Sequence, residues 1–319
     1  MKNFDSLSLY NDLTEEPTEN AGRKYVFRND TGTGSTTVYS VFPGIELLYN
    51  EIHMAYCSSG ARTDGKVIEI NHCQQGRGEC GFGDRTFGYM GPGDLAFCSL
   101  DRTAHSTAFP MNHYHGITIT VNSDGITENT RDLLQSFSVD LEKVAAIFDQ
   151  QDFFIVRANP YIEHIFSELY EVDDAIREGY LKVKVVELLL TLTHFDIVKD
   201  KRKYLSHSQT ELAKRVQERI ADNPASKMSI DSLAAEQSVS PTHLKNCFRE
   251  VYGTSVYAYI KDYRLQIAAK MLCETDLSIQ DIAGKIGFEN PNKFSSAFRS
   301  HFGMPPTEYK KSVRMDRNV

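Results

Sequence analysis

Between residues 36 and 122 the apolar residues come in short runs that glycine, proline and aspartate interrupt. The runs are TTVYSVF, GIELLYNEIHMAYC, KVIEINHC, RTFGYM, DLAFCSL and HGITITVN. Runs of this length, rich in β-branched and aromatic residues, predict strands, and their regular spacing indicates an antiparallel sandwich or a small barrel. Residues 1–35 are polar and rich in Asn, Thr and Gly, so we expect irregular structure there.

A helical pattern replaces the strand pattern from about residue 129. Asn159 and Pro160 suit the cap and the first residue of a helix. Apolar residues then follow at the i, i+3, i+4, i+7 spacing of one helix face, namely Ile162, Ile165, Phe166 and Leu169.

The segment LKVKVVELLLTLTHFDIV, residues 181–198, is apolar almost all round. Its β-branched residues also suit a strand, but its length favours a buried helix. A helix that is apolar on every side needs partners on every side. This segment is therefore either an interface between two copies of the chain or part of the core of one chain. The basic and polar stretch VKDKRKYLSHS that follows suits a linker, which we place at residues 199–209.

The C-terminal third contains an internal repeat. The first copy is MSIDSLAAEQSVSPTHLKNCFREVYGTSVYAY and the second is LSIQDIAGKIGFENPNKFSSAFRSHFGMPPTEY. Across the two copies Ser229 corresponds to Ser278, Ala234 to Ala283, Pro241 to Pro291, Phe248 to Phe298, Arg249 to Arg299, Gly253 to Gly303 and Tyr259 to Tyr309. Chance is a poor explanation for a register shared over about thirty residues.

Each copy has the pattern of a helix, a short turn and a second helix. A serine caps the first helix, and a small alanine in its middle permits close approach of the second. Proline begins the second helix, where its missing N–H is tolerated, and glycine follows its end, where a left-handed residue is favoured.

The second helix of each copy has an apolar face and a polar face. The polar face carries Asn292, Lys293, Ser296 and Arg299 in one copy, and Thr242, His243, Lys245, Asn246 and Arg249 in the other. In a helix-turn-helix this helix lies in the DNA major groove, where Asn pairs with adenine and Arg with guanine. Exposed polar residues of an ordinary helical bundle are the alternative, which two matched copies disfavour. Both arginines come late in their helices and suit phosphate as well as bases.

Charge and spacing agree with this interpretation. Residues 201–319 hold 19 Lys and Arg against 13 Asp and Glu, a net charge of +6, while residues 1–200 carry 16 against 30, a net of −14. A helix is predicted between the copies within residues 255–274, and about eighteen residues of helix span roughly 27 Å at about 1.5 Å per residue. Successive major grooves on one side of DNA lie about 34 Å apart, within reach of two helices on such a spacer.

These motifs resemble the DNA-binding domain of the AraC/XylS family of transcription regulators over residues 210–312. The resemblance implies base contacts from Thr242, Lys245 and Asn246 in the first unit and from Asn292 and Ser296 in the second. The sequence departs from the family pattern at Ser238, where glycine is usual, and at Pro291 and Ser296, where some members carry longer polar side chains.

The strands of the N-terminal part, with the stretch GRGECGFGDRTFGYMGPGDLAFCSL, resemble the cupin-type sensing domain of the same family. The expected architecture is multidomain α+β, with a cupin-like antiparallel β-barrel and helices followed by an all-α domain with two helix-turn-helix units. We expect an irregular segment at 1–35, a sensing domain at 36–128, a helical dimerisation region at 129–198, and the DNA-binding domain at 210–313. The resemblance implies double-stranded DNA, a small-molecule effector, a second copy of the chain and RNA polymerase as partners.

Candidate chemistry in the barrel centres on four residues: Glu69, His105, His113 and His115. The two last lie on one face of a strand with Ile117, Ile119 and Val121, so they would sit at one end of the cavity if that face pointed inward. Polar contacts to an effector, structural hydrogen bonds and a metal site are the three interpretations. The early HxH pair of metal-dependent cupins is absent, since the corresponding strand reads VIEINHC, so we expect no metal and no cofactor.

The six cysteines form no CxxC pair and are expected to be reduced. Cys73, Cys80 and Cys98 fall on predicted strands and suit buried, inert thiols, with redox or metal sensing as the alternative. The polar N-terminus lacks a secretory signal, and no apolar run is long enough for a membrane span, so we expect a cytoplasmic protein. A ligand-responsive transcription regulator without enzymatic activity is the leading hypothesis. A metal-dependent cupin enzyme fused to a DNA-binding module and a regulator without any small effector are the alternatives.

Overall fold

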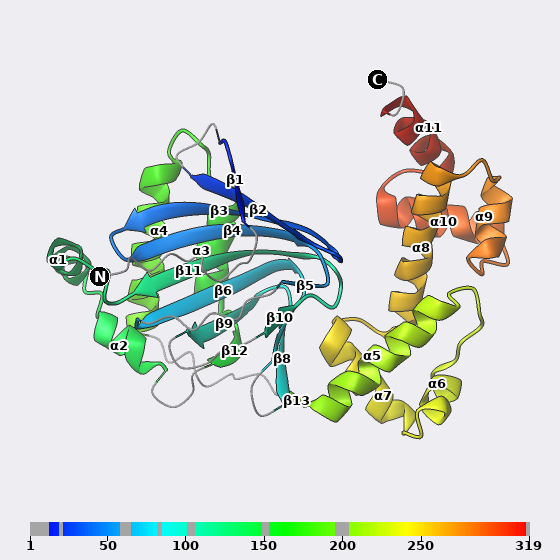
Figure 1. The fold of residues 1–319 in the computed structure, drawn as a ribbon, viewed down its shortest axis with the longest axis horizontal. Coiled ribbons are helices and arrows are strands. Elements are labelled where there is room, and N and C mark those ends of the chain that lie inside the picture. The colour runs from blue at the N-terminus through cyan, green and yellow to red at the C-terminus, as the bar shows by residue number, and fades with distance from the viewer. Residues whose placement is uncertain are drawn as a thin grey trace. The chain divides into compact units, whose positions relative to one another are not determined.

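The structure is a computed structural model that describes residues 13–18, 22–57, 65–81, 85–100, 106–148, 153–194 and 204–316. The chain divides into two compact units, Met1–His207 and Ser208–Val319 (Figure 1). The first unit contains a large antiparallel sheet, and the second is helical.

Eight strands form the large sheet in the order β1-β2-β3-β4-β11-β6-β9-β12, and every pairing is antiparallel. The strands are β1 (Thr14–Glu16), β2 (Arg23–Asn29), β3 (Gly32–Phe42), β4 (Ile45–His53), β6 (Val67–Gly76), β9 (Asp94–Ser99), β11 (Tyr114–Asn122) and β12 (Phe153–Arg157). Five of the six apolar runs form the strands β3, β4, β6, β9 and β11 of this sheet. The end of the second run and the run RTFGYM supply two strands of a smaller sheet.

The smaller sheet has the order β13-β8-β7-β10-β5 and is also antiparallel. Its strands are β5 (Tyr56–Cys57), β7 (Gly78–Gly81), β8 (Thr86–Met90), β10 (Ser106–Ala108) and β13 (Leu205–Ser206). The two sheets share one apolar core, to which the small sheet contributes Cys57, Cys80 and Met90. Ile52 and Ile155 of the large sheet pack into the same core.

The other face of the large sheet is covered by helices (Figure 1). These are α1 (Glu128–Ser136), α2 (Leu141–Ala146), α3 (Pro160–Tyr170) and α4 (Arg177–His194). Successive residues of a strand point to opposite faces. Ile117 and Ile119 of β11 therefore lie in the core under the helices, together with Phe166 and Leu188. Tyr114, an even position of the same strand, lies in the core between the sheets.

Three predictions of segment structure are wrong in part. Residues 1–35 contain β1 and β2 and the start of β3, because Tyr25 and Phe27 alternate with polar residues and are buried in the sheet. The region 129–198 contains β12, which extends the sheet through pairing with β9. The linker 199–209 contains β13 and the start of α5; its residues 199–203 lie outside the described residues.

Both helices predicted in the region 129–198 are present. Asn159 caps α3 by accepting the backbone N–H of Ile162, and Pro160 occupies the first turn. The helix α4 begins earlier than the apolar pattern, at Arg177, and residues 195–198 lie outside the described residues. Buried Leu188 and Leu189 place much of α4 in the core of its own chain, but Val183 remains 62% exposed.

The second unit consists of seven helices within the residues that the structure describes. They are α5 (His207–Asp222), α6 (Ile230–Glu236), α7 (Pro241–Tyr252), α8 (Val256–Glu274), α9 (Ile279–Lys285), α10 (Pro291–Phe302) and α11 (Pro306–Asp316). The repeat is confirmed in its local structure. Ser229 and Ser278 cap α6 and α9, and Gly253 and Gly303 end α7 and α10 in the left-handed conformation, with φ of 71° and 76°.

The turns inside the two helix pairs differ at one equivalent position. Ser238 and Gly287 both have positive φ, 55° and 82°, which favours glycine. A Cβ on Gly287 would also lie 2.6 Å from the carbonyl oxygen of Ala225, so the second turn requires glycine for two reasons. Only the conformational cost applies to Ser238.

We expect Ser238→Gly to raise the free energy of unfolding of this unit by about 0.5–1 kcal/mol, because glycine adopts a positive φ at little cost. The reverse change, Gly287→Ser, is expected to lower it by more, since strain and collision with Ala225 add. Urea denaturation followed by far-UV circular dichroism measures both. Equal effects of the two changes would contradict this account.

Candidate nucleic-acid interface

The helix α7 separates its apolar and polar residues by face. Ser240 caps it by accepting the backbone N–H of His243, and Pro241 stands in its first turn. Leu244, Phe248 and Val251 are buried. The predicted reading residues are all exposed, namely Thr242, His243, Lys245, Asn246 and Arg249. The buried apolar residues hold α7 in its domain, so its five polar side chains are left exposed and accessible to a partner.

The helix α10 repeats this arrangement. Asn290 caps it through bonds from the N–H groups of Asn292 and Lys293, and Phe294 and Phe298 are fully buried. Asn292, Lys293, Ser296 and Arg299 are exposed, as predicted. Each exposed face combines amide or hydroxyl groups near the start of the helix with cations along it. Such groups donate hydrogen bonds to phosphate oxygens and base edges.

Arg264 of α8 ties the two helix pairs together, and the sequence analysis did not single it out. Its guanidinium donates to the carbonyls of Pro224 at 2.6 Å and Ser226 at 2.9 Å, both before α6. It also donates to the carbonyl of Gly287, at 3.3 Å, in the turn between α9 and α10. One side chain thereby fixes the entry to the first pair against the turn of the second. The helix also carries Lys261 and Lys270, so the sequence pattern has no signal that separates Arg264 from these other cations.

Comparison with known proteins agrees with this geometry. A helix-turn-helix domain family matches residues 233–312. The probable transcription factor PqrA of Proteus vulgaris is 34% identical over 88 residues, which are 28% of this chain and 72% of PqrA. The transcriptional activator AarP of Providencia stuartii is 32% identical over 93 residues, 29% of this chain and 69% of AarP. The chain belongs to the AraC/XylS family of transcription regulators.

The family model that matches this AraC-type regulator lies within its second unit. A transcriptional regulator of Chromobacterium violaceum, described as an AraC-type DNA-binding domain protein, is structurally similar at a TM-score of 0.32 and 27% identity, over 33% of this chain and 95% of the other. In two further curated relatives the matched segment spans only 12% and 34% of their length.

The effector residues predicted for the N-terminal unit are not brought together. Glu69 is buried in the core between the sheets and pairs with Thr120 in the register. His115 lies five residues along β11, about 16 Å away, on the opposite face, with its ring 5.6 Å from that of Tyr170 on α3. The two histidines would sit in the cavity only if the face with Ile117 and Ile119 pointed inward, and that face lies under the helices instead. His113 stacks on His53, and His105 lies outside the described residues.

A row of buried polar side chains crosses the inner face of the large sheet. The side-chain amide of Asn50 donates to the hydroxyl of Thr118 at 2.9 Å, and that hydroxyl donates to Asn71 at 2.6 Å. Asn71 in turn bonds Glu69, yet burial raises the pKa of Glu69 to about 7. Among the described residues, Asn50 Oδ1 has no hydrogen-bond partner. Single polar residues inside apolar strand runs, as in LLYNEI and GITITV, are the sequence signal for this row.

Four cysteines lie buried beside this row, as expected for three of them. Burial raises the pKa of Cys57, Cys73 and Cys80 to about 12, so they are protonated at neutral pH. The thiolate is the reactive form of cysteine, and its scarcity here agrees with inert thiols. In the described part of the chain no three His, Cys, Asp or Glu side chains are grouped as metal ligands.

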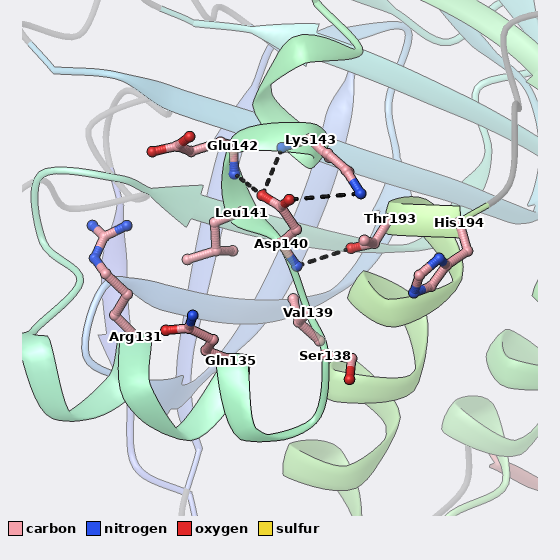
Figure 2. Close-up of a pocket in the computed structure, with 10 residues that line it drawn as sticks. All are labelled: Arg131, Gln135, Ser138, Val139, Asp140, Leu141, Glu142, Lys143, Thr193 and His194. Carbon is pink, nitrogen blue, oxygen red and sulfur yellow. Dashed lines mark hydrogen bonds and ion pairs between the residues drawn. The ribbon is translucent and has the colours of Figure 1, made fainter.

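A pocket of about 460 Å³ lies where α1, α2 and the end of α4 meet (Figure 2). Four of its residues, Asp140, Glu142, Lys143 and Thr193, bond one another. Asp140 accepts the backbone N–H groups of Glu142 and Lys143, each at 3.1 Å, and its own N–H donates to the hydroxyl of Thr193. These bonds join the start of α2 to the end of α4. None of the described helices has the length and apolar character to cross a lipid bilayer.

Proposed function

We propose that this protein is a cytoplasmic transcription regulator that binds specific double-stranded DNA through two helix-turn-helix units. The units are α6–α7 and α9–α10, and α7 and α10 enter the major groove. One observation carries the proposal: both copies of the repeat bury matched apolar residues and expose matched polar faces. A helix bundle with only a structural role has no need for two polar faces in the same register.

The division of roles follows from position on each helix. Asn246, Asn292 and Ser296 lie near the first turns and suit base edges. Arg249 and Arg299 lie in the last turns, and Lys293 adds a further cation, so these groups suit phosphates. The helix α8, which joins the units, is 19 residues long and spans about 28 Å. Two elements about one helical turn of DNA apart are the expected target.

Selection of sites from random duplexes by the full chain tests this proposal. Two enriched elements about one helical turn apart support a double reader. One enriched element would mean that a single unit reads bases. No enrichment at low salt would overturn the proposal and assign the repeat to protein binding.

Two substitutions separate base reading from phosphate binding. Asn292→Ala is expected to relax preference at one base pair, a loss of about 1–3 kcal/mol of discrimination. Arg299→Ala is expected to weaken all sequences alike and to reduce the slope of log K against log salt by about 1. Lys182→Ala, the same loss of charge in the other unit, serves as control. Fluorescence anisotropy on the selected site at several salt concentrations measures all three. Loss of base preference in Arg299→Ala alone would reverse the two roles.

We propose further that the N-terminal unit is a cupin-like sensing domain, with its effector in the core between the sheets. The buried polar row and the unpartnered Asn50 Oδ1 support this place, since a buried polar atom without a partner is costly. A ligand of the native state raises the melting temperature. Melting of the full chain and of Glu69→Gln with fractionated metabolites tests the proposal. No shift with any fraction would favour a regulator without a small effector, and stoichiometric metal in the purified chain would favour the cupin enzyme.

We propose further that the protein forms a homodimer through α4. Bound to DNA, it contacts RNA polymerase. Val183 is 62% exposed, and Val186 and Leu190 follow it at the i+3 and i+7 positions of the same helix face. An apolar stripe of this spacing suits helix pairing. Sedimentation equilibrium of the full chain and of Val183→Glu measures it. A monomer at all concentrations would remove the dimer.

A further inference from the structure

A groove of about 410 Å³ opens on the helix-covered side of the large sheet, apart from the core between the sheets. Three chain segments form its walls: the end of β6, the turn before β9, and the end of β12 with one side of α3 from Pro160 to Tyr170. The volume lies within the range of about 300–1,000 Å³ that small-molecule sites occupy.

The floor of the groove is a buried histidine that the sequence analysis passed over. The side chain of His72 is 4% exposed and stacks on Phe166, with ring centroids 4.2 Å apart and an angle of 7° between the rings. Its Nδ1 lies 3.1 Å from the hydroxyl of Tyr170. Burial lowers the pKa of His72 to about 4, so the imidazole is neutral at neutral pH.

The other nitrogen of His72 faces a carboxylate without bonding it. Nε2 lies 3.7 Å from Oε2 of Glu163 on α3, too far for a hydrogen bond. Among the described residues, neither Nε2 nor Oε1 of Glu163 has a hydrogen-bond partner. A buried polar atom without a partner is costly, and this groove holds two of them. The Glu163 side chain is 38% exposed, so it reaches the open groove.

A guanidinium stands opposite this carboxylate. Arg157 donates to the carbonyl of Pro92 and lies 3.6 Å from the carboxylate of Asp94, yet its side chain is 56% exposed. Gly93 makes the arrangement possible. A Cβ there would collide with Glu163 Oε1 and lie 2.6 Å from Arg157. The groove thus sets an acceptor, Glu163, beside a donor, Arg157, and His72 belongs to the same lining.

The charges around the groove cancel. Asp94 and Glu163 are the nearby carboxylates, and Arg157 and Arg77 are the nearby cations. A charged ligand would therefore meet no net opposite charge. A hydroxyl group both donates and accepts, so it can donate to Glu163 while it accepts from His72 or Arg157.

From these observations we infer that the groove binds a small, uncharged, polyhydroxylated molecule, with Glu163, Arg157 and His72 as its polar contacts. This site is separate from the effector place proposed between the sheets. It also does not depend on DNA binding.

Calorimetric titration of the full chain with sorbitol, myo-inositol, glucose and galactose, at up to about 10 mM, tests the inference. We expect at least one of them to bind. Gluconate and glucosamine, which add a charge to the glucose skeleton, are expected to bind at least about tenfold more weakly. Tighter binding of either charged compound would overturn the ligand class. If none of the compounds binds, the proposed site is wrong, and a water molecule between His72 and Glu163 would satisfy the unpartnered atoms instead.

Three variants locate the binding. Glu163→Gln is expected to weaken it at least about tenfold, while Glu171→Gln, the same change at the exposed end of α3, leaves it unchanged. Gly93→Ala is expected to abolish it, and Glu163→Gln decides the matter if that variant fails to fold. Binding lost in Glu69→Gln and kept in Glu163→Gln would place the ligand between the sheets and overturn the inference.

Discussion

Replacing Phe298 with alanine is expected to lower the free energy of unfolding of the α9–α10 pair by about 3–5 kcal/mol. The side chain is fully buried and packs edge-on against Phe294 and Tyr309, with ring centroids 5.6 Å and 5.4 Å apart. It also contacts Phe302. Alanine leaves a cavity under the helix that carries the second reading face, so DNA binding by that unit is expected to fall with the stability.

Hydrogen exchange of the full chain, measured on peptides from α9 and α10 by mass spectrometry, follows this loss locally. Tyr257→Ala is the control, since that side chain is 78% exposed and large effects need a buried group. Peptides of α3, in the other unit, should exchange as before. Unchanged protection of α10 in Phe298→Ala would mean that the helix is held by something other than its aromatic core.

Replacing Arg264 with alanine is expected to lower the free energy of unfolding of the C-terminal unit by about 2–4 kcal/mol, because the carbonyls of Pro224 and Ser226 lose a charged donor. The change also frees the first helix pair from the turn at Gly287. Affinity for a site with both elements is expected to fall more than affinity for a single element, since the spacing of α7 and α10 is no longer held.

Two further variants sharpen this test. Arg264→Lys keeps the charge but presents one compact ammonium in place of a planar fork, so it is expected to retain only part of the stability. Lys270→Ala, an exposed cation of the same helix, is the matched control. Urea denaturation and anisotropy titrations with one-element and two-element duplexes provide the measurements. Equal losses on both duplexes would show that Arg264 supports the fold without setting the spacing.

The second unit could be predicted from the sequence almost residue by residue. Its signals are local: a serine before a helix, a proline in the first turn and a glycine after the last turn act through bonds within a few residues. The internal repeat shows the same signals a second time in the same register. As this register predicts, Phe248 and Phe298 are both fully buried. Ser238 departs from the expected glycine, and the structure shows the same left-handed backbone there.

The N-terminal unit could be predicted only as a class of structure. The six strand runs are present, but β12, which joins the sheet from a distance of more than fifty residues, was not predicted, although its run FFIV is typical of a strand. The effector residues predicted for this unit are not close together. Glu69 and His115 were grouped because both are polar residues on strands, whereas the register places them on opposite faces.

By itself, then, the sequence determined the helix pairs, their caps and their exposed polar faces, because each depends on contacts between residues close in the chain, and these motifs also indicated the family. Only the tertiary structure decided which face of β11 meets the helices, that Arg264 joins 224, 226 and 287, and that His72, Arg157 and Glu163 share a groove. These are contacts between distant segments. Strand register and helix packing set them, and both depend on the free energy of the whole unit rather than on any local pattern.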